Sequence, residues 1–220
     1  MIFKKKDFIG LQSFGEEIAN AITHGIGIIL SIIALLFLLN GSYRGTTAHV
    51  VSSALYGGSL FILYTFSTLY HSIFHEKAKK VLRRLDHIGI YLLIAGTCMP
   101  IALVALKGTL GWMLFGIECG MCLIGVVFKA VFGARLGVLS TIFYLLMGWV
   151  AMIVIKPIAV AISFNGFVWM VLGGVFYSLG VIFFAIDKKV SYFHALWHLF
   201  VLAGSICHFF MVFLYVIPIV

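Results

Sequence analysis

The chain has 220 residues, of which 63% are hydrophobic and 10% are charged, and its mean hydropathy is +1.18. This composition lies outside the range of soluble domains and excludes an ordinary water-soluble enzyme or binding module. The formal net charge of +8 is explained by membrane topology and by the attraction of basic residues to anionic lipid headgroups. It therefore does not indicate a nucleic-acid partner. We therefore expect a chain that is embedded mostly in lipid.

Seven stretches are apolar and long enough to cross a bilayer, since a transmembrane helix needs about 20 such residues. In chain order they cover approximately residues 18–39, 47–73, 88–106, 109–130, 136–155, 165–186 and 194–217. The first stretch is longer than the core of a signal peptide and lacks a small-residue cleavage site, which favours a retained helix. We predict an all-α fold, a seven-transmembrane helix bundle, that forms a single integral membrane domain over residues 1–220.

Lys and Arg are distributed unequally between the two sides of this bundle. If the N-terminus is cytoplasmic, only Arg44, Lys107 and Lys156 lie outside. The remaining twelve basic residues then lie inside: Lys4, Lys5, Lys6, Lys77, Lys79, Lys80, Arg83, Arg84, Lys129, Arg135, Lys188 and Lys189. Because cytoplasmic loops retain positive charge, we predict a cytoplasmic N-terminus and an outer C-terminus.

The last predicted helix opens with His194-Ala-Leu-Trp-His198. Residues four apart lie one above the other on a helix, so both imidazoles can contact a single ion. His71 ends the second helix, and the predicted orientation brings it to the same leaflet. Three neutral imidazoles with an open fourth position are the arrangement of a catalytic zinc site. We predict zinc as the cofactor, although the same ligands admit other transition metals.

Asp86 and Ser67 are candidate catalytic residues beside this site. Ser67 lies four residues before His71 and so on the same helical face, where it could hydrogen-bond a water or a developing oxyanion. Asp86 could hold that water, act as a general base or orient a histidine. As structural alternatives, Ser67 could bond its own helix, and Asp86 could cap the third helix while pairing with Arg83 or Arg84.

Other polar residues in apolar surroundings also need an explanation. His208 is expected either to line a substrate cavity or to make an interhelical hydrogen bond. His24 and Glu17 are expected to have interfacial roles at the start of the first helix, and His87 is expected to be solvated. Glu118 falls inside the fourth helix, where an ionised carboxylate is costly, so it should be protonated, paired or directed into a wet cavity.

Several of these residues lie in motifs that resemble those of the progestin and adipoQ receptor family, and specifically its bacterial hemolysin III branch. The motifs are Ser67-Thr-Leu-Tyr-His71, Leu85-Asp86, and the HxxxH pair followed by Leu-Phe-Val-Leu-Ala-Gly-Ser-Ile-Cys-His208-Phe. The segment Glu17-Ile-Ala-Asn-Ala-Ile-Thr-His24-Gly is similar to the N-terminal signature of that branch. The resemblance extends from about residue 16 to residue 213.

The resemblance implies a seven-helix bundle with an intramembrane zinc near the cytoplasmic face, bound by His71, His194 and His198, with Asp86 and Ser67 close by. It also implies a multi-pass protein of the bacterial plasma membrane. The family is grouped with alkaline ceramidases as metal-dependent lipid amide hydrolases. Its bacterial branch takes its name from a lytic activity, and one homologue is associated with membrane homeostasis.

Three functions stay open at this point. The first is a zinc-dependent hydrolase of a ceramide-like lipid amide or ester that serves membrane fluidity. The second is a non-enzymatic sensor or receptor of membrane state with structural zinc, and the third is a pore-forming hemolysin with cytolytic activity. A membrane lipid is the expected substrate or ligand, and the sequence does not define the oligomeric state.

Overall fold

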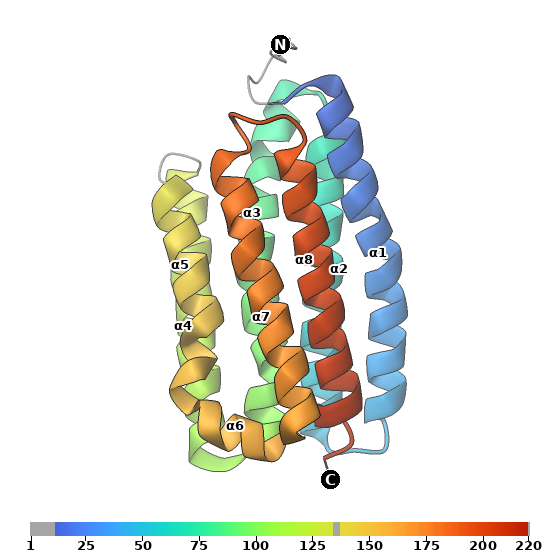
Figure 1. Ribbon diagram of the computed structural model, residues 1–220, viewed down its shortest axis with the longest axis vertical. Helices are drawn as coiled ribbons and strands as arrows, with labels where there is room; N and C mark the ends of the chain where they lie inside the picture. Colours follow the sequence, from blue (N-terminus) through green and yellow to red (C-terminus); the bar gives the residue numbers. More distant parts are fainter. Residues whose placement is uncertain (1–11, 134–136, 220) are drawn as a thin grey trace.

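The computed structural model describes residues 12–133 and 137–219. Within these ranges the chain forms helices and no strand, and seven helical spans are long and apolar enough to cross a membrane. Figure 1 places the start of the first span and the end of the last span at opposite ends of the bundle, as an odd number of spans requires. The all-α, seven-helix prediction is thus confirmed, whereas the side of the membrane that each end faces stays a prediction. Lys4, Lys5, Lys6 and Arg135, which contribute to that prediction, lie outside the described residues.

The seven spans are built from α-helices and three short irregular helices. The α-helices are α1 (Phe14–Ser42), α2 (Thr47–Ser72), α3 (Glu76–Pro100), α4 (Gly108–Phe132), α5 (Gly137–Trp149), α6 (Ile155–Ala161), α7 (Ser163–Ile186) and α8 (Phe193–Met211). The irregular helices are the π-helix η1 (Ile101–Leu106), the 3-10 helix η2 (Val150–Val154) and the π-helix η3 (Val212–Val216). The third span widens into η1 directly after Pro100, whose ring lacks the N–H that a continuing α-helix needs.

The third span begins twelve residues earlier than its apolar part, at Glu76 instead of residue 88. The extra residues are mostly Lys, Arg, Leu and Ala, which are good helix formers, and the His75 side chain accepts a hydrogen bond from Ala78 N at 3.4 Å. Asp86 therefore lies well inside α3. The alternative that Asp86 caps this helix was wrong, because His75 occupies the cap position.

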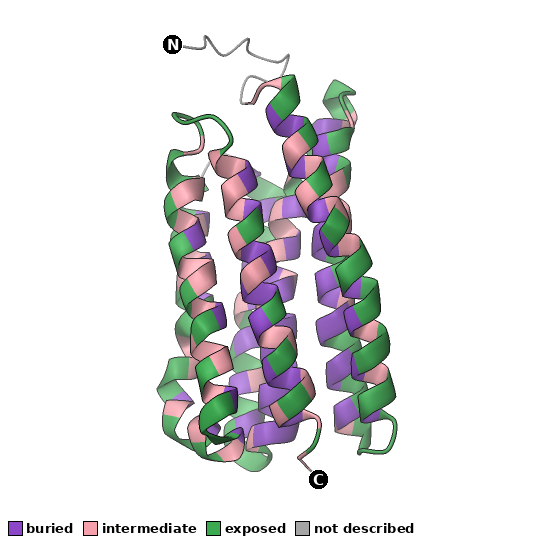
Figure 2. Cartoon of the chain, turned by 45° about the vertical axis from the view of Figure 1, so that its right-hand side comes forward, coloured by how far each residue is buried: buried purple, intermediate pink, exposed green. Residues whose placement is uncertain are grey.

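Buried residues line the inward sides of the helices, and exposed residues line the outward sides (Figure 2). Many of the exposed side chains are large and apolar, such as Ile29, Leu123 and Val160, as expected for surfaces that face lipid. α1, α2 and α3 pack in sequence, and α8 packs between α1 and α7. Close approach of α1 to α2 depends on Gly57, where an added Cβ would lie 3.1 Å from Leu35 Cα.

Candidate metal centre

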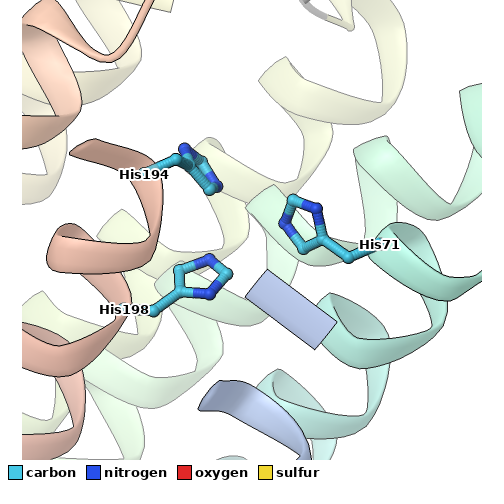
Figure 3. Close-up of side chains that lie close together, drawn as sticks. All are labelled: His71, His194 and His198. Carbon is cyan, nitrogen blue, oxygen red and sulfur yellow. The ribbon is translucent and has the colours of Figure 1, made fainter. Parts of the chain in front are cut away.

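Three histidines from two helices meet where α2 ends and α8 begins (Figure 3). His71 lies in the last turn of α2, and His194 and His198 lie in the first turns of α8. One ring nitrogen from each residue can be chosen so that all three lie within 4.8 Å of one another. The centroids of the His194 and His198 rings are 4.7 Å apart, and each is 5.1 Å from that of His71. This spacing allows one ion to contact all three rings.

A buried ion pair fixes the orientation of His71. Its Nδ1 lies 2.6 Å from Glu17 Oε2, and because a carboxylate only accepts hydrogen bonds, Nδ1 is the protonated nitrogen. The second oxygen of Glu17 accepts a hydrogen bond from Lys79 Nζ at 2.7 Å. The Lys79 ammonium also lies over the rings of Tyr70 and Phe74, so the pair is enclosed. His71 Nε2 is buried and has no hydrogen-bond partner among the described residues.

The other two histidines are oriented in the same way. His194 Nδ1 lies 2.7 Å from Asp187 Oδ2 in the segment between α7 and α8, which leaves His194 Nε2 without a partner in the described part of the chain. His198 Nδ1 lies 3.3 Å from the backbone oxygen of Asn20 and 3.2 Å from Thr23 Oγ1. Such bonds to the nitrogen that does not bind metal are usual around metal-ligating histidines. Each ring therefore has its Nδ1 occupied and its Nε2 available as a ligand.

The start of α1 supplies most of these orienting groups. Ser13 caps the helix in a capping box with Glu16, whose Oε2 accepts a hydrogen bond from Ser13 N at 2.8 Å. Glu16 Oε1 also accepts a hydrogen bond from Tyr192 N at 2.9 Å, directly before α8. Residues three and four apart share one helical face, so Glu17, Asn20 and the residues one turn later all face α2 and α8. The bond between Glu16 and Tyr192 thus joins the start of α1 to the residue directly before α8.

Asp86 and Ser67, the predicted catalytic residues, lie beside the three histidines. Asp86 is buried and interacts electrostatically with His194. The Ser67 hydroxyl is close to the Asp86 carboxylate, although it makes no hydrogen bond of normal geometry with any described residue. The alternative that the Ser67 hydroxyl bonds a carbonyl of its own helix was therefore wrong. Ser67 thus lies one helical turn before His71 in α2, near the carboxylate of Asp86 in α3.

An apolar cavity of about 150 Å³ extends from the histidines into the bundle. Its walls come mainly from α3, α5, α7 and α8. Six of the lining residues carry an imidazole or a carboxylate: His24, Asp86, His87, His194, His198 and His208. Trp149 and Met152 also line the cavity, and their side chains are exposed on the outer surface of the molecule. The cavity thus connects the histidines with the side of the bundle.

The structure corrects three expectations and resolves two others. His87 is half-buried and lines the cavity, so the expectation of a solvated histidine was wrong because α3 continues through this position. Glu17 and His24 are both buried, Glu17 bonds to His71 and His24 lines the cavity, so neither has the expected interfacial role. His208 both lines the cavity and bonds the Met170 backbone oxygen at 3.1 Å. Glu118 is completely buried, with the Cys98 thiol 3.6 Å from its Oε1.

The donor set suits zinc. Two of the three Nε2 atoms are buried without partners, an arrangement that is unfavourable unless a further group contacts them. Three neutral imidazoles are a ligand set that zinc commonly takes in catalytic sites, with a fourth position left for water or substrate. Other divalent transition metals can bind the same nitrogens. The structure thus shows a site that could hold a metal ion.

The fold and the site define a multi-pass membrane protein with a buried histidine cluster at one end of a seven-helix bundle. A family model described as "Haemolysin-III related" matches residues 12–209, so the chain belongs to this family.

Two bacterial relatives are similar along nearly their whole length. "Hemolysin-3" of Bacillus cereus is 50% identical over 208 residues, which is 94% of each chain. "Hemolysin-3 homolog" of Bacillus subtilis (strain 168) is 49% identical over 205 residues, covering 93% of this chain and 96% of the relative. These relatives and the seven apolar spans confirm the predicted multi-pass protein of the bacterial plasma membrane.

A more distant relative comes from humans. "Monocyte to macrophage differentiation factor" of Homo sapiens is 29% identical over 217 residues, covering 91% of this chain and 84% of the relative. This similarity agrees with the predicted place of the hemolysin III branch within a wider receptor family.

Proposed function

We propose that the chain is a zinc-dependent hydrolase that cuts an acyl amide or ester of a membrane lipid, and that it thereby serves the homeostasis of membrane lipids and fluidity. The observation that carries this proposal is the position of Asp86. This carboxylate and two of the clustered histidines, His194 and His198, line one and the same apolar cavity. A metal site, an acid–base group and a space for an acyl chain thus adjoin one another.

The residues of the chain have distinct roles in this reaction. His71, His194 and His198 hold the metal, which when bound supplies a Lewis acid that polarises a carbonyl and acidifies water. Asp86 accepts the proton of the attacking water and delivers it to the leaving amine or alcohol. Ser67 donates a hydrogen bond to the water or to the carbonyl oxygen as negative charge develops there. Glu17 and Asp187 keep the histidines in the correct tautomer.

The shape of the cavity supports a lipid substrate. Most of its lining is apolar, and the carboxylate of Asp86 and the imidazoles of His194 and His198 are among its polar groups. An acyl chain placed along α3, α7 and α8 would bring its polar end to the metal. The exposed side chains of Trp149 and Met152 mark a lateral entrance, through which a lipid could enter from the bilayer without passing through water.

The test is a turnover measurement with mass spectrometry. Purified zinc-loaded protein would be incubated in nanodiscs with a panel of ceramides, N-acyl amines and phospholipids, beside Asp86→Asn as the matched control. The proposal predicts free fatty acid from at least one lipid with the wild type and at least 100-fold less with Asp86→Asn, since general acid–base catalysis contributes about 10²–10⁴-fold.

Two other outcomes of this experiment would contradict the hydrolase. Zinc bound without any product would instead support the sensor of membrane state. Release of a dye entrapped in liposomes that contain the same protein, measured in parallel and without hydrolysis, would support the lytic activity that the names of the two bacterial relatives carry.

A further inference from the structure

A fourth histidine, His24, lies against the metal centre without belonging to it. Its ring is stacked on that of His198, with the centroids 3.5 Å apart and the planes 11° from parallel. The lone pairs of an imidazole lie in the plane of the ring, so two parallel rings cannot direct their nitrogens at one ion between the three ligands. The cluster of possible metal ligands accordingly does not include His24.

His24 has hydrogen-bonding capacity that the protein leaves unused. Its side chain lies in α1 and is almost completely buried, with 3% of its surface exposed. Neither ring nitrogen makes a hydrogen bond with any described residue, although the His198 backbone oxygen lies nearby without hydrogen-bond geometry. A buried polar atom without a partner is unfavourable, and a neutral imidazole has both a donor and an acceptor to satisfy.

Two neighbouring rings fix the position of His24, and the cavity lies on a further side of it. One face of the ring is covered by His198, and the ring of Tyr64 packs edge-on with its centroid 5.0 Å away. Tyr64 is held in turn by a hydrogen bond of 2.7 Å to Ser205 Oγ. His24 also lines the cavity together with Asp86 and His194. A group that enters the cavity next to the metal therefore meets the unpartnered imidazole.

We propose that His24 is a substrate-binding residue, whose N–H donates a hydrogen bond to an oxygen of the lipid headgroup beside the bond that is cut. A ligand without a polar atom at this level would leave the imidazole unsatisfied, so His24 selects lipids with an amide, ester or hydroxyl oxygen at the metal end of the cavity. The identity of the ligand as a lipid amide or ester rests on the proposed function, whereas the binding role of His24 is testable without turnover.

The experiment measures equilibrium binding of two radiolabelled probes to purified protein in detergent. The polar probe is N-dodecylacetamide, and the apolar probe is an alkane of similar length. The variant is His24→Phe, which keeps a flat ring for stacking on His198 but removes both nitrogens. His49→Phe is the matched control, because His49 is also buried but bonds the Ile219 backbone oxygen elsewhere in the bundle.

The expected result is a selective loss of affinity. His24→Phe should bind the amide about tenfold more weakly, which is the effect of one buried hydrogen bond, and should bind the alkane and zinc as the wild type does. His49→Phe should leave both affinities unchanged. His24→Gln, which retains a donor, should recover part of the affinity for the amide.

Three results would overturn the role of His24. The first is an unchanged affinity of His24→Phe for the amide, and the second is an equal loss for both probes, which would assign His24 a packing role only. If His24→Phe does not fold, the infrared band of a ¹³C-labelled amide carbonyl bound to metal-free Ser67→Ala protein, which lacks the other proposed donor, decides: a hydrogen-bonded carbonyl supports the proposal, and a free carbonyl contradicts it. None of these readouts requires hydrolysis, so failure of the hydrolase proposal would be seen separately.

Discussion

The two sides of the cavity differ in how tightly their helices are packed. On one side, 72% of the apolar window of the third span and half of those of α2 and α8 are buried. On the other side, the corresponding share is 22% for the fifth span and 11% for α7. The closely packed side carries the three clustered histidines and Asp86, whereas the open side contributes mainly aromatic and aliphatic residues to the cavity. Precise placement of ligands and access for a lipid are thus separated between different helices.

The largest effect is expected from the histidines on the packed side. Replacing His71 or His198 with Ala removes one of three ligands, and we expect each variant to retain less than about a tenth of the zinc that the wild type binds. Elemental analysis of purified protein measures this content. His49→Ala is the control and should keep its zinc; equal zinc in His198→Ala and the wild type would show that the metal binds elsewhere.

Replacing the carboxylates that orient the histidines should lower zinc binding less than removing a histidine does. Glu17→Gln and Asp187→Asn leave all three ligands in place but weaken the acceptors for His71 and His194. Loss of such a partner typically lowers metal affinity 10–100-fold, which a zinc competition titration with a chelator detects. Glu118→Gln serves as the comparison, since Glu118 contacts Cys98 instead of a histidine. If Glu118→Gln lowered the affinity for zinc as strongly as Glu17→Gln does, the orienting role assigned to Glu17 would be wrong.

The difference in packing itself can be tested with two glycines. An added Cβ at Gly57 would lie 3.1 Å from Leu35 Cα, whereas the nearest atom to an added Cβ at Gly174, which lines the cavity, is in Trp149 at 3.8 Å. Gly57→Ala should lower the free energy of unfolding by about 1–3 kcal/mol, as overpacking does. Gly174→Ala should change it little.

Thermal unfolding in detergent provides the measurement for both glycine variants. Equal destabilisation by Gly57→Ala and Gly174→Ala would contradict the contrast between the two sides of the cavity.

The sequence predicted the helices well because hydropathy marks them directly. It placed the start of α3 too late, since the first three turns are charged and a search for apolar residues does not detect them. The same omission led to the wrong interpretation of His87 as solvated. A search for helix formers after His75 would have found these turns.

The sequence also brought the three histidines to one leaflet, and the structure places them in contact. It did not reveal Asp187 or Asn20 as partners of His194 and His198, because those contacts depend on how α1 and the segment before α8 fold together. The sequence indicated an interfacial role for Glu17. Its pairing with His71 and Lys79 joins three helices, and residue spacing along one helix does not predict such a contact. The repeat of Glu17, Asn20 and His24 on one helical face was the available clue.

The most direct test of the central claim is zinc X-ray absorption spectroscopy on the purified wild type. The proposed site predicts about three imidazole nitrogens and one exchangeable oxygen at about 2.0–2.1 Å from the zinc. An open position of this kind is what a hydrolase requires. A shell of four protein ligands would indicate a structural metal, and protein that binds no zinc at all would contradict the metal centre itself.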